Sequence, residues 1–207
     1  MNWLQTQVQT NPKKLFIQHQ KNCYSYLDVF EMVRIYSKAL LRQDIRQNDR
    51  VVIYLPSGID MVEIILACFE IGAVAAPISE NITKKELQTI VNNINPSMII
   101  SNWNHRKLFS SYLIPISCIE DLPNLSGGCS IIGSKYKNKS EDICAIILTS
   151  GTTGIPKAVQ LTYENFETSC NNWNTFLEFQ SNDQFLCCLP LNHIGGLAVL
   201  IRALIYR

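Results

Sequence analysis

The sequence predicts an α/β protein, because apolar runs of strand length alternate with amphipathic helical segments along its 207 residues. Pro, Gly and Asn separate many of these runs, as expected of turns between strands and helices. Hydrophobic residues make up 47% of the chain and charged residues 17%, which is typical of a globular protein with a substantial core.

The first part of the chain is expected to form a hairpin, a helix and a buried strand, in that order. Residues 15–20 and 23–26 predict a short hairpin that turns at Lys21-Asn22. Residues 27–41 predict a helix, because apolar side chains recur on one helical face. That face consists of Val29, Met32, Val33, Tyr36, Ala39 and Leu40. The apolar run 50–55 predicts a buried strand.

Two further pairs of helix and strand follow. Pro56-Ser57-Gly58 separates the buried strand from a helix at 59–71, after which a short strand of small residues is expected at 73–77. A capping-box pattern opens a helix at 83–93, and a strand is expected at 98–100. These elements continue the alternation that defines the α/β class.

The second part of the chain is expected to begin with a connection. Residues 122–140 are rich in Ser, Gly, Asn and Lys, which predicts a connection between two lobes. A strand is then expected at 143–148, and a helix at 162–177 with Thr162 as its N-cap. Another strand is expected at 184–189.

The last segment, 196–207, is apolar and helix-like but carries no capping signal. Its apolar stripe consists of Leu197, Leu200, Ile201, Leu204 and Ile205. Because a natural domain rarely ends on an uncovered apolar stripe, we expect this chain to end inside a larger fold.

Composition and cysteine pattern exclude several classes of protein. The formal net charge of +1 lacks the strong positive charge of a dedicated nucleic-acid binder, so no nucleic-acid partner is expected. The N-terminus shows no secretory signal, and charges interrupt the most apolar stretch, 59–78, so no membrane span is expected. The eight cysteines lack C-x-x-C pairs and zinc-ligand spacing, which predicts reduced structural thiols and no metal site.

The strongest functional signal is the run from Thr149 to Lys157, with four hydroxyl side chains, two glycines and one lysine. Glycine lets backbone N–H groups converge on an anion, and hydroxyls and a lysine add donors and charge, so the run predicts a polyphosphate site. We expect it to lie between the strand 143–148 and the following helix. The alternative is a flexible turn. The Walker A pattern is not matched, because Lys157 follows proline and precedes Ala158.

This run resembles the signature of the adenylate-forming enzyme superfamily, which includes acyl-CoA synthetases, peptide-synthetase adenylation domains and luciferases. The next residue is usually glycine in that family and is Ala158 here. Residues 23–26, 48–51 and 72–77 also fit an acyl-CoA synthetase. The resemblance implies the N-terminal portion of the large adenylate-forming domain, with mixed and parallel sheets flanked by helices. The residues it assigns to nucleotide phosphate are Thr149, Ser150, Gly151, Thr152, Thr153, Gly154 and Lys157.

A second motif, Leu189 to Leu197, resembles the family's next motif, in which a histidine or aromatic residue borders the acyl pocket. Its form, Pro-Leu-x-His-Ile-x-Gly-Leu followed by Arg202, is most similar to o-succinylbenzoate–CoA ligases of menaquinone and phylloquinone synthesis. The resemblance implies catalytic roles for Lys157 and His193. The residues it assigns to the acyl substrate are His193, Gly195, Gly196 and Arg202. The alternatives are a hydrogen-bonded loop residue for His193 and a solvated or ion-paired side chain for Arg202.

The family reaction has two half-steps and uses ATP, Mg²⁺ and coenzyme A. A small-molecule carboxylate attacks the α-phosphate of ATP, which gives an acyl-adenylate and pyrophosphate, and the coenzyme A thiol then displaces AMP. The family's other motifs and its C-terminal lid domain are not found before Arg207. Residues 1–207 are therefore expected to be a partial domain, completed by a missing C-terminal segment or, alternatively, acting as a homo-oligomer.

Three functions stay open on sequence alone. The chain is part of an acid–CoA ligase, a truncated non-catalytic product, or an unrelated phosphate-binding module. Within the first, the acid is o-succinylbenzoate, a fatty acid, an aryl acid or an amino acid. The expected location is the cytoplasm, or the plastid stroma if the gene is organellar, because the abundant Ile, Asn and Lys fit an AT-rich bacterial or organellar genome.

Overall fold

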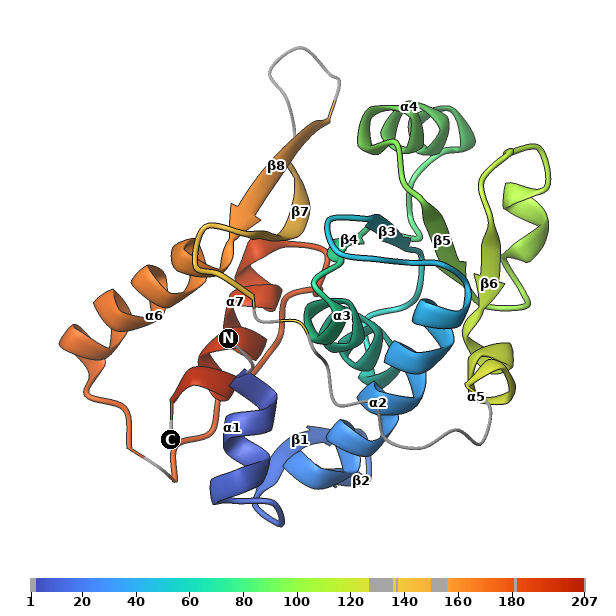
Figure 1. Ribbon diagram of the computed structural model, residues 1–207. Helices are drawn as coiled ribbons and strands as arrows, with labels where there is room; N and C mark the ends of the chain where they lie inside the picture. Colours follow the sequence, from blue (N-terminus) through green and yellow to red (C-terminus); the bar gives the residue numbers. More distant parts are fainter. Residues whose placement is uncertain (1–2, 127–135, 137, 150–155, 181, 207) are drawn as a thin grey trace.

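The computed structural model describes residues 3–126, 136, 138–149, 156–180 and 182–206, and it confirms the α/β class (Figure 1). The strands are β1 (Leu15–His19), β2 (Asn22–Ser25), β3 (Arg50–Ile53), β4 (Val74–Pro77), β5 (Met98–Ser101), β6 (Ile116–Cys118), β7 (Ile143–Thr149) and β8 (Lys157–Thr162). The helices are α1 (Trp3–Thr10), α2 (Tyr26–Arg42), α3 (Ile59–Ile71), α4 (Lys84–Ile94), α5 (Leu122–Leu125), α6 (Tyr163–Leu177) and α7 (Ile194–Ile205). Two short 3-10 helices, η1 (Arg106–Phe109) and η2 (Ile119–Asp121), flank β6.

Six strands form one sheet in the order β6-β5-β3-β4-β7-β8, and β1 and β2 form a separate antiparallel hairpin. The strands from β6 to β7 are parallel, whereas β8 at the edge is antiparallel to β7. Parallel strands end at the same edge of a sheet, where ligands bind in open α/β folds. The segments that follow β3 and β7 therefore leave the sheet at one edge, with only β4 between the two strands.

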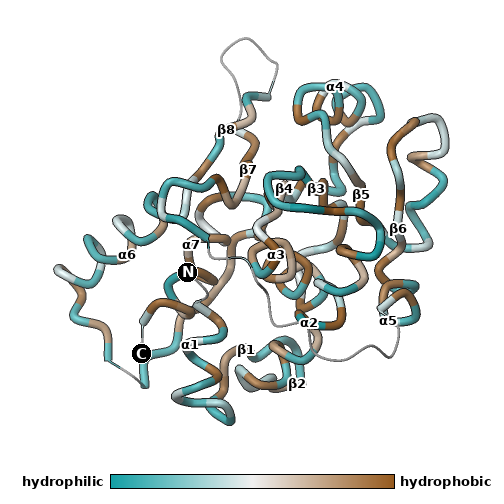
Figure 2. Tube along the Cα trace, in the orientation of Figure 1, coloured by the Kyte–Doolittle hydropathy of each residue, from teal (hydrophilic) through white to brown (hydrophobic). Residues whose placement is uncertain are grey.

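The two faces of the sheet belong to two apolar clusters. Along β3 the side chains alternate: Val51 and Ile53 join the cluster that contains α2, α3 and α7, while Val52 joins the cluster that contains α4. Helix α3 is buried along nearly its whole length. Figure 2 shows the contrast between this apolar helix and the more hydrophilic α6. The sheet is thus covered on both faces, as parallel sheets require.

Local signals set several element boundaries as predicted. Thr83 and Glu86 form the expected capping box of α4, with the Thr83 N–H donating to Glu86 Oε2 at 2.8 Å. Thr162 caps α6 by accepting a hydrogen bond from the Asn165 N–H. Helix α3 spans the predicted residues and ends at Gly72, whose φ of 73° favours glycine.

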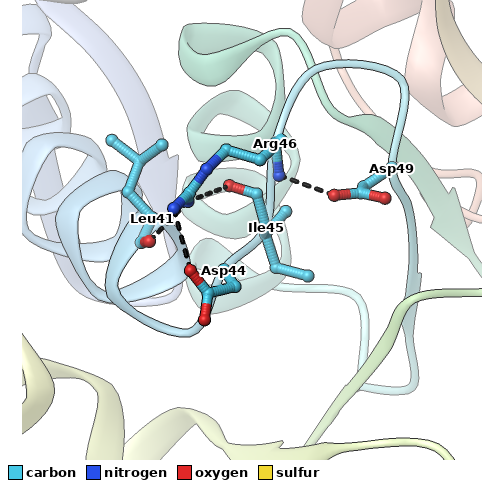
Figure 3. Close-up of polar contacts among 5 residues, drawn as sticks. All are labelled: Leu41, Asp44, Ile45, Arg46 and Asp49. Atoms are coloured by element: carbon cyan, nitrogen blue, oxygen red, sulfur yellow. Dashed lines mark hydrogen bonds and ion pairs between the residues drawn. The ribbon is translucent and has the colours of Figure 1, made fainter.

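The connection from α2 to β3 is held by one arginine (Figure 3). The Arg46 guanidinium donates to the Leu41 carbonyl at the end of α2 (2.6 Å) and forms an ion pair with Asp44 (2.9 Å). The Arg46 N–H donates to Asp49 Oδ2 at 2.7 Å. The Leu41 carbonyl also accepts from the Asp44 N–H at 3.2 Å, so Arg46 reinforces the end of α2 and ties it to the loop that leads into the central strand.

Three expectations about strands need correction. The β1–β2 hairpin exists, but it turns at Gln20-Lys21, because Gln20 adopts a positive φ of 56° and Asn22 already pairs with His19. Strand β8 was not expected, since its first residue, Lys157, belongs to the run Thr149–Lys157, which was expected to lead into a helix. The predicted strand at 184–189 is wrong: that segment makes no ladder with the described strands, and all of its residues except Phe185 are exposed.

The expected uncovered stripe on the last helix is also wrong. Leu197 and Ile201 are fully buried within this chain, in the cluster that contains α3. The Gln7 side chain of α1 donates to the Leu204 carbonyl at 2.8 Å, and Tyr26 Oη donates to the Ala203 carbonyl at 2.8 Å. Helix α7 is covered by α1, by α6 and by Tyr26 at the start of α2, and α1 and α2 are too distant in sequence for a local pattern to indicate this. Helices α1 and α5 and strand β6 were not predicted either.

The remaining sequence expectations concern the connection, membranes and cysteines. The connection at 122–140 begins with α5, and residues 127–135 and 137 lie outside the described residues. No helix in the described ranges is long and apolar enough to cross a membrane. Of the seven cysteines that the structure describes, all free, four are buried and Cys23, Cys187 and Cys188 are exposed. Burial raises the pKa of the Cys68 thiol to about 12.

Candidate functional site

The phosphate run lies on a hairpin. Thr149 ends β7 and Lys157 begins β8, and the two residues pair across the antiparallel ladder. Ser150, Gly151, Thr152, Thr153 and Gly154, which the sequence assigns to phosphate, lie outside the described residues. The expectation of a strand-to-helix loop is therefore wrong, because β8 intervenes before α6. No helix N-terminus directly follows the run, because β8 lies between it and α6.

The described ends of the run are open to solvent. Thr149 and Lys157 are exposed, whereas Ala145, Ile146 and Ile147 of β7 are buried. In Figure 1 the β7–β8 hairpin extends away from the helices that cover the sheet. This places one hydroxyl and one ammonium group side by side in solvent, at the carboxyl edge of the parallel strands.

His193 lies in a turn that ends at the start of α7. The His193 N–H donates to the Pro190 carbonyl at 3.0 Å, and the His193 carbonyl accepts from the N–H groups of Gly196 (3.1 Å) and Leu197 (3.0 Å). The residue is exposed, and its side chain makes no capping bond to the helix. The backbone is therefore fixed while the imidazole faces solvent.

The two predicted glycines have different surroundings. A Cβ on Gly196 would collide with the backbone carbonyl oxygens of Leu189 and Pro190, so only glycine allows this helix end to approach that segment. A Cβ on Gly195 would meet Leu189 Cδ1 at 2.5 Å, and that flexible side chain can move. Gly196 is thus needed for backbone packing, whereas the role that the resemblance implies for it, binding of the acyl substrate, stays a prediction.

Arg202 lies two turns along α7 from the His193 turn. Its guanidinium carbon is 5.1 Å from the ring centroid of Trp173 and 6.0 Å from that of Phe185. Its Nε is buried without a hydrogen-bond partner. The alternative of a solvated side chain does not fit these contacts, since Arg202 is held between two aromatic rings with one donor unused.

The described part of the chain contains a cleft of about 970 Å³. It is bounded by the β1–β2 hairpin, the segment 179–191 and α7. Ser57 and Leu191 line it, whereas neither Lys157 nor His193 is among the described residues that do. The structure therefore brings the His193 turn to the rim of a cleft and keeps the phosphate hairpin outside it.

Two carboxyl groups lie at the start of α3, next to this cleft. Burial raises the pKa of Glu63 to about 8, and the nearby Asp60 carboxylate adds to the effect. Burial and the Glu120 carboxylate raise the pKa of Asp60, which His19 partly opposes. Sequence analysis missed these groups and Ser57, because their relation to the His193 turn exists only in three dimensions.

The donor set in the described residues does not form a metal centre by itself. No group of three or more His, Cys, Asp or Glu side chains in those ranges is arranged to hold an ion. Mg²⁺ commonly binds through substrate phosphates and water with few protein ligands. An exposed hydroxyl and ammonium beside the phosphate run are compatible with that mode, in which the ion arrives with the nucleotide.

The fold and the run at Thr149–Lys157 define a class of protein. The model of the family "AMP-binding enzyme" matches residues 4–206, and the chain belongs to this family.

Among curated relatives, the chain is 30% identical over 206 residues to the 2-succinylbenzoate–CoA ligase of Oceanobacillus iheyensis. It is 25% identical over 205 residues to the ligase of the same name from Bacillus cytotoxicus. These alignments cover 99% of this chain and 42% and 41% of the relatives. The chain thus spans less than half the length of the curated relatives it matches.

Solved structures share the fold. The o-succinylbenzoate CoA synthetase (MenE) of Bacillus subtilis, in complex with the acyl-adenylate intermediate OSB-AMP, has a TM-score of 0.91 at 23% identity, over 99% of this chain and 53% of the other. The same synthetase in complex with ATP and magnesium ion has a TM-score of 0.89 at 22% identity, over 99% and 55%. VinN with 3-methylaspartate reaches 0.85 at 18% identity, over 98% and 58%.

Proposed function

We propose that this chain is the N-terminal part of an ATP-dependent carboxylic acid–CoA ligase, and that its acid is 2-succinylbenzoate. The observation that carries the proposal is the pairing of Thr149 with Lys157 at the carboxyl edge of an AMP-binding fold. The names of the curated relatives and the His193 motif support the choice of acid. The proposed reaction forms an acyl-adenylate and pyrophosphate from ATP, and the coenzyme A thiol then displaces AMP.

The phosphate hairpin has two roles in this proposal. Lys157 presents its ammonium group to the phosphates, where charge develops as pyrophosphate leaves. Thr149 offers a hydroxyl beside it, and the run 150–154 supplies further hydroxyls and backbone N–H donors. Mg²⁺ bound to the phosphates would neutralise part of their charge. The exposure of Thr149 and Lys157 fits a site that a second half of the enzyme closes.

The acyl part of the site is proposed at the start of α7. His193 faces solvent from a fixed turn and would border the acid near its reacting carboxylate. Gly195 and Gly196 leave room beside it, and Gly196 also holds the turn against the backbone of Leu189. Arg202, with an unused Nε, would pair with a second carboxylate such as that of a succinyl chain.

The rest of the enzyme is proposed to pack beside α6. Large apolar side chains are exposed on α6 and on the segment that follows it: Trp173, Phe176, Leu177, Leu186 and Leu189. Exposed apolar groups of this size mark interaction surfaces. We propose that the remainder of the ligase, including its lid domain and the coenzyme A site, covers them and completes the partial domain 1–207. A cytoplasmic location is part of the same proposal.

A pyrophosphate-release assay tests the proposal. The chain is extended with its in-frame downstream coding sequence and assayed with ATP, Mg²⁺, coenzyme A and a panel of 2-succinylbenzoate, fatty, aryl and amino acids. We expect 2-succinylbenzoate to give the fastest release. Another acid in first place would overturn the specificity, and an in-frame stop with no release by any acid would favour the non-catalytic alternative.

A matched pair of lysine variants tests the phosphate assignment. Lys157→Ala is expected to lower kcat/KM for ATP by about 10- to 100-fold, because one charge-assisted contact in the transition state is lost. Lys13→Ala removes an exposed lysine of the N-terminal region and serves as the control. Equal activity of the two variants would contradict the role of Lys157.

A further inference from the structure

The backbone of the His193 turn has one hydrogen bond to a distant part of the chain. The Leu191 N–H donates to Ser57 Oγ at 3.0 Å, across a separation of 134 residues. Ser57 follows β3 at the carboxyl edge of the sheet and precedes α3. The hydroxyl thus connects the centre of the sheet to the turn that carries His193.

Geometry inside the turn leaves this N–H without a local partner. Pro190 accepts from the His193 N–H, which closes a four-residue turn, and Leu191 is its second residue. The Leu191 side chain is 6% exposed and packs in the core, so its N–H needs a partner from outside the turn. The hydroxyl of Ser57 is that partner.

Two other contacts restrict the turn. Gly196 lets α7 approach the Leu189 and Pro190 carbonyl groups, and Leu191 anchors the turn in the core. The Pro190 carbonyl, on one side of the Pro190–Leu191 peptide, is held inside the turn by the His193 N–H. The Ser57 hydrogen bond is directed along the N–H on the other side of the same peptide and ties it to a distant element.

We propose that Ser57 is a positioning residue for His193: its hydroxyl fixes the Pro190–His193 turn and with it the direction of the imidazole. The consequence for catalysis rests on the proposed ligase function, in which His193 borders the acid. In that reaction Ser57 acts only through the turn.

The test uses the 207-residue chain and two substitutions. Ser57→Ala removes the acceptor, and Ser57→Thr keeps a hydroxyl at the same position. We expect Ser57→Ala to speed amide exchange at Leu191 by about 2- to 10-fold, as the loss of one hydrogen bond predicts. We also expect it to shift the NMR signal of the His193 imidazole, which His193→Gln assigns among the three histidines. Ser57→Thr should retain both wild-type values.

A control separates this effect from general loss of stability. Ser110→Ala removes another exposed serine hydroxyl, which donates to the Lys107 carbonyl at 3.0 Å far from the turn in sequence, and should leave both readouts unchanged. The proposal is overturned if Ser57→Ala keeps the wild-type rate of Leu191 amide exchange and the wild-type His193 imidazole signal. It is also overturned if Ser57→Thr behaves like Ser57→Ala. Neither readout needs ATP or an acid, so a failure of pyrophosphate release counts against the ligase function alone.

Discussion

The two halves of the candidate site differ in how the fold holds them. The phosphate hairpin projects Thr149 and Lys157 into solvent, and the described part of it is supported there by the ladder between β7 and β8. The His193 turn is fixed by a buried leucine, a glycine pressed against backbone and a hydroxyl from another element. Substitutions in the phosphate hairpin should therefore cost little folding free energy, whereas the His193 turn is part of the core.

The largest expected effect comes from the helix that carries the His193 turn. Leu197→Ala should lower the free energy of unfolding by about 2–5 kcal/mol, because it leaves a cavity at a fully buried position. Urea unfolding of the chain measures this. Leu186→Ala, at a residue that is 85% exposed, is the control and should change stability by less than about 0.5 kcal/mol. If Leu197→Ala changed the unfolding free energy as little as the control does, α7 would not be packed in the core as described.

The next prediction separates the two neighbouring glycines. Gly196→Ala should cost about 1–3 kcal/mol of unfolding free energy, because its Cβ meets two backbone carbonyl oxygens that cannot move alone. Gly195→Ala should cost less, since only the Leu189 side chain has to rotate. The two variants are compared by thermal and urea unfolding. The reverse order would show that the turn does not depend on close backbone approach.

The free energy of unfolding is expected to depend on pH through Glu63 of α3. Its pKa is raised to about 8 in the folded chain, so the folded state keeps a proton that the unfolded state loses at lower pH. This contribution to stability is complete below the unfolded pKa and is lost as pH rises through about 8. Glu63→Gln should reduce the decrease in unfolding free energy as pH rises. At pH 8.5 the variant should be about 1–3 kcal/mol more stable than the wild type.

The control for this pH prediction is Glu31→Gln, at an exposed position of α2. Urea unfolding between pH 5 and 9 is compared for both variants and the wild type. If the unfolding free energy of Glu63→Gln fell with pH as steeply as that of the wild type, other groups would cause the pH dependence. Asp60 is one such group, because burial also raises its pKa.

The smallest expected effect on stability lies in the phosphate hairpin. Lys157→Ala should change the unfolding free energy by less than about 0.5 kcal/mol, because the side chain is exposed. The same variant is expected to lose ATP-dependent activity in the extended enzyme. A decrease of more than about 1 kcal/mol in the unfolding free energy of Lys157→Ala would contradict the difference in stability between the two halves of the site.

The sequence by itself determined the elements whose signals are local. The capping boxes at Thr83 and Thr162 and the left-handed Gly72 act within a few residues, so α3, α4 and α6 could be predicted closely. The phosphate run and the His193 motif indicated the family for the same reason, since both are contiguous in the chain.

Tertiary structure decided what depends on distant partners. The run 184–189 has the composition of a strand, but it forms no ladder with the described strands, because a strand also needs a pairing partner that local sequence does not supply. The sequence shows no partner for the apolar stripe on α7, whereas in the structure α1, α6 and Tyr26 of α2 contact this helix. The contact from Ser57 to Leu191 joins residues that no periodicity relates, because hydrogen bonds and packing depend on proximity in space.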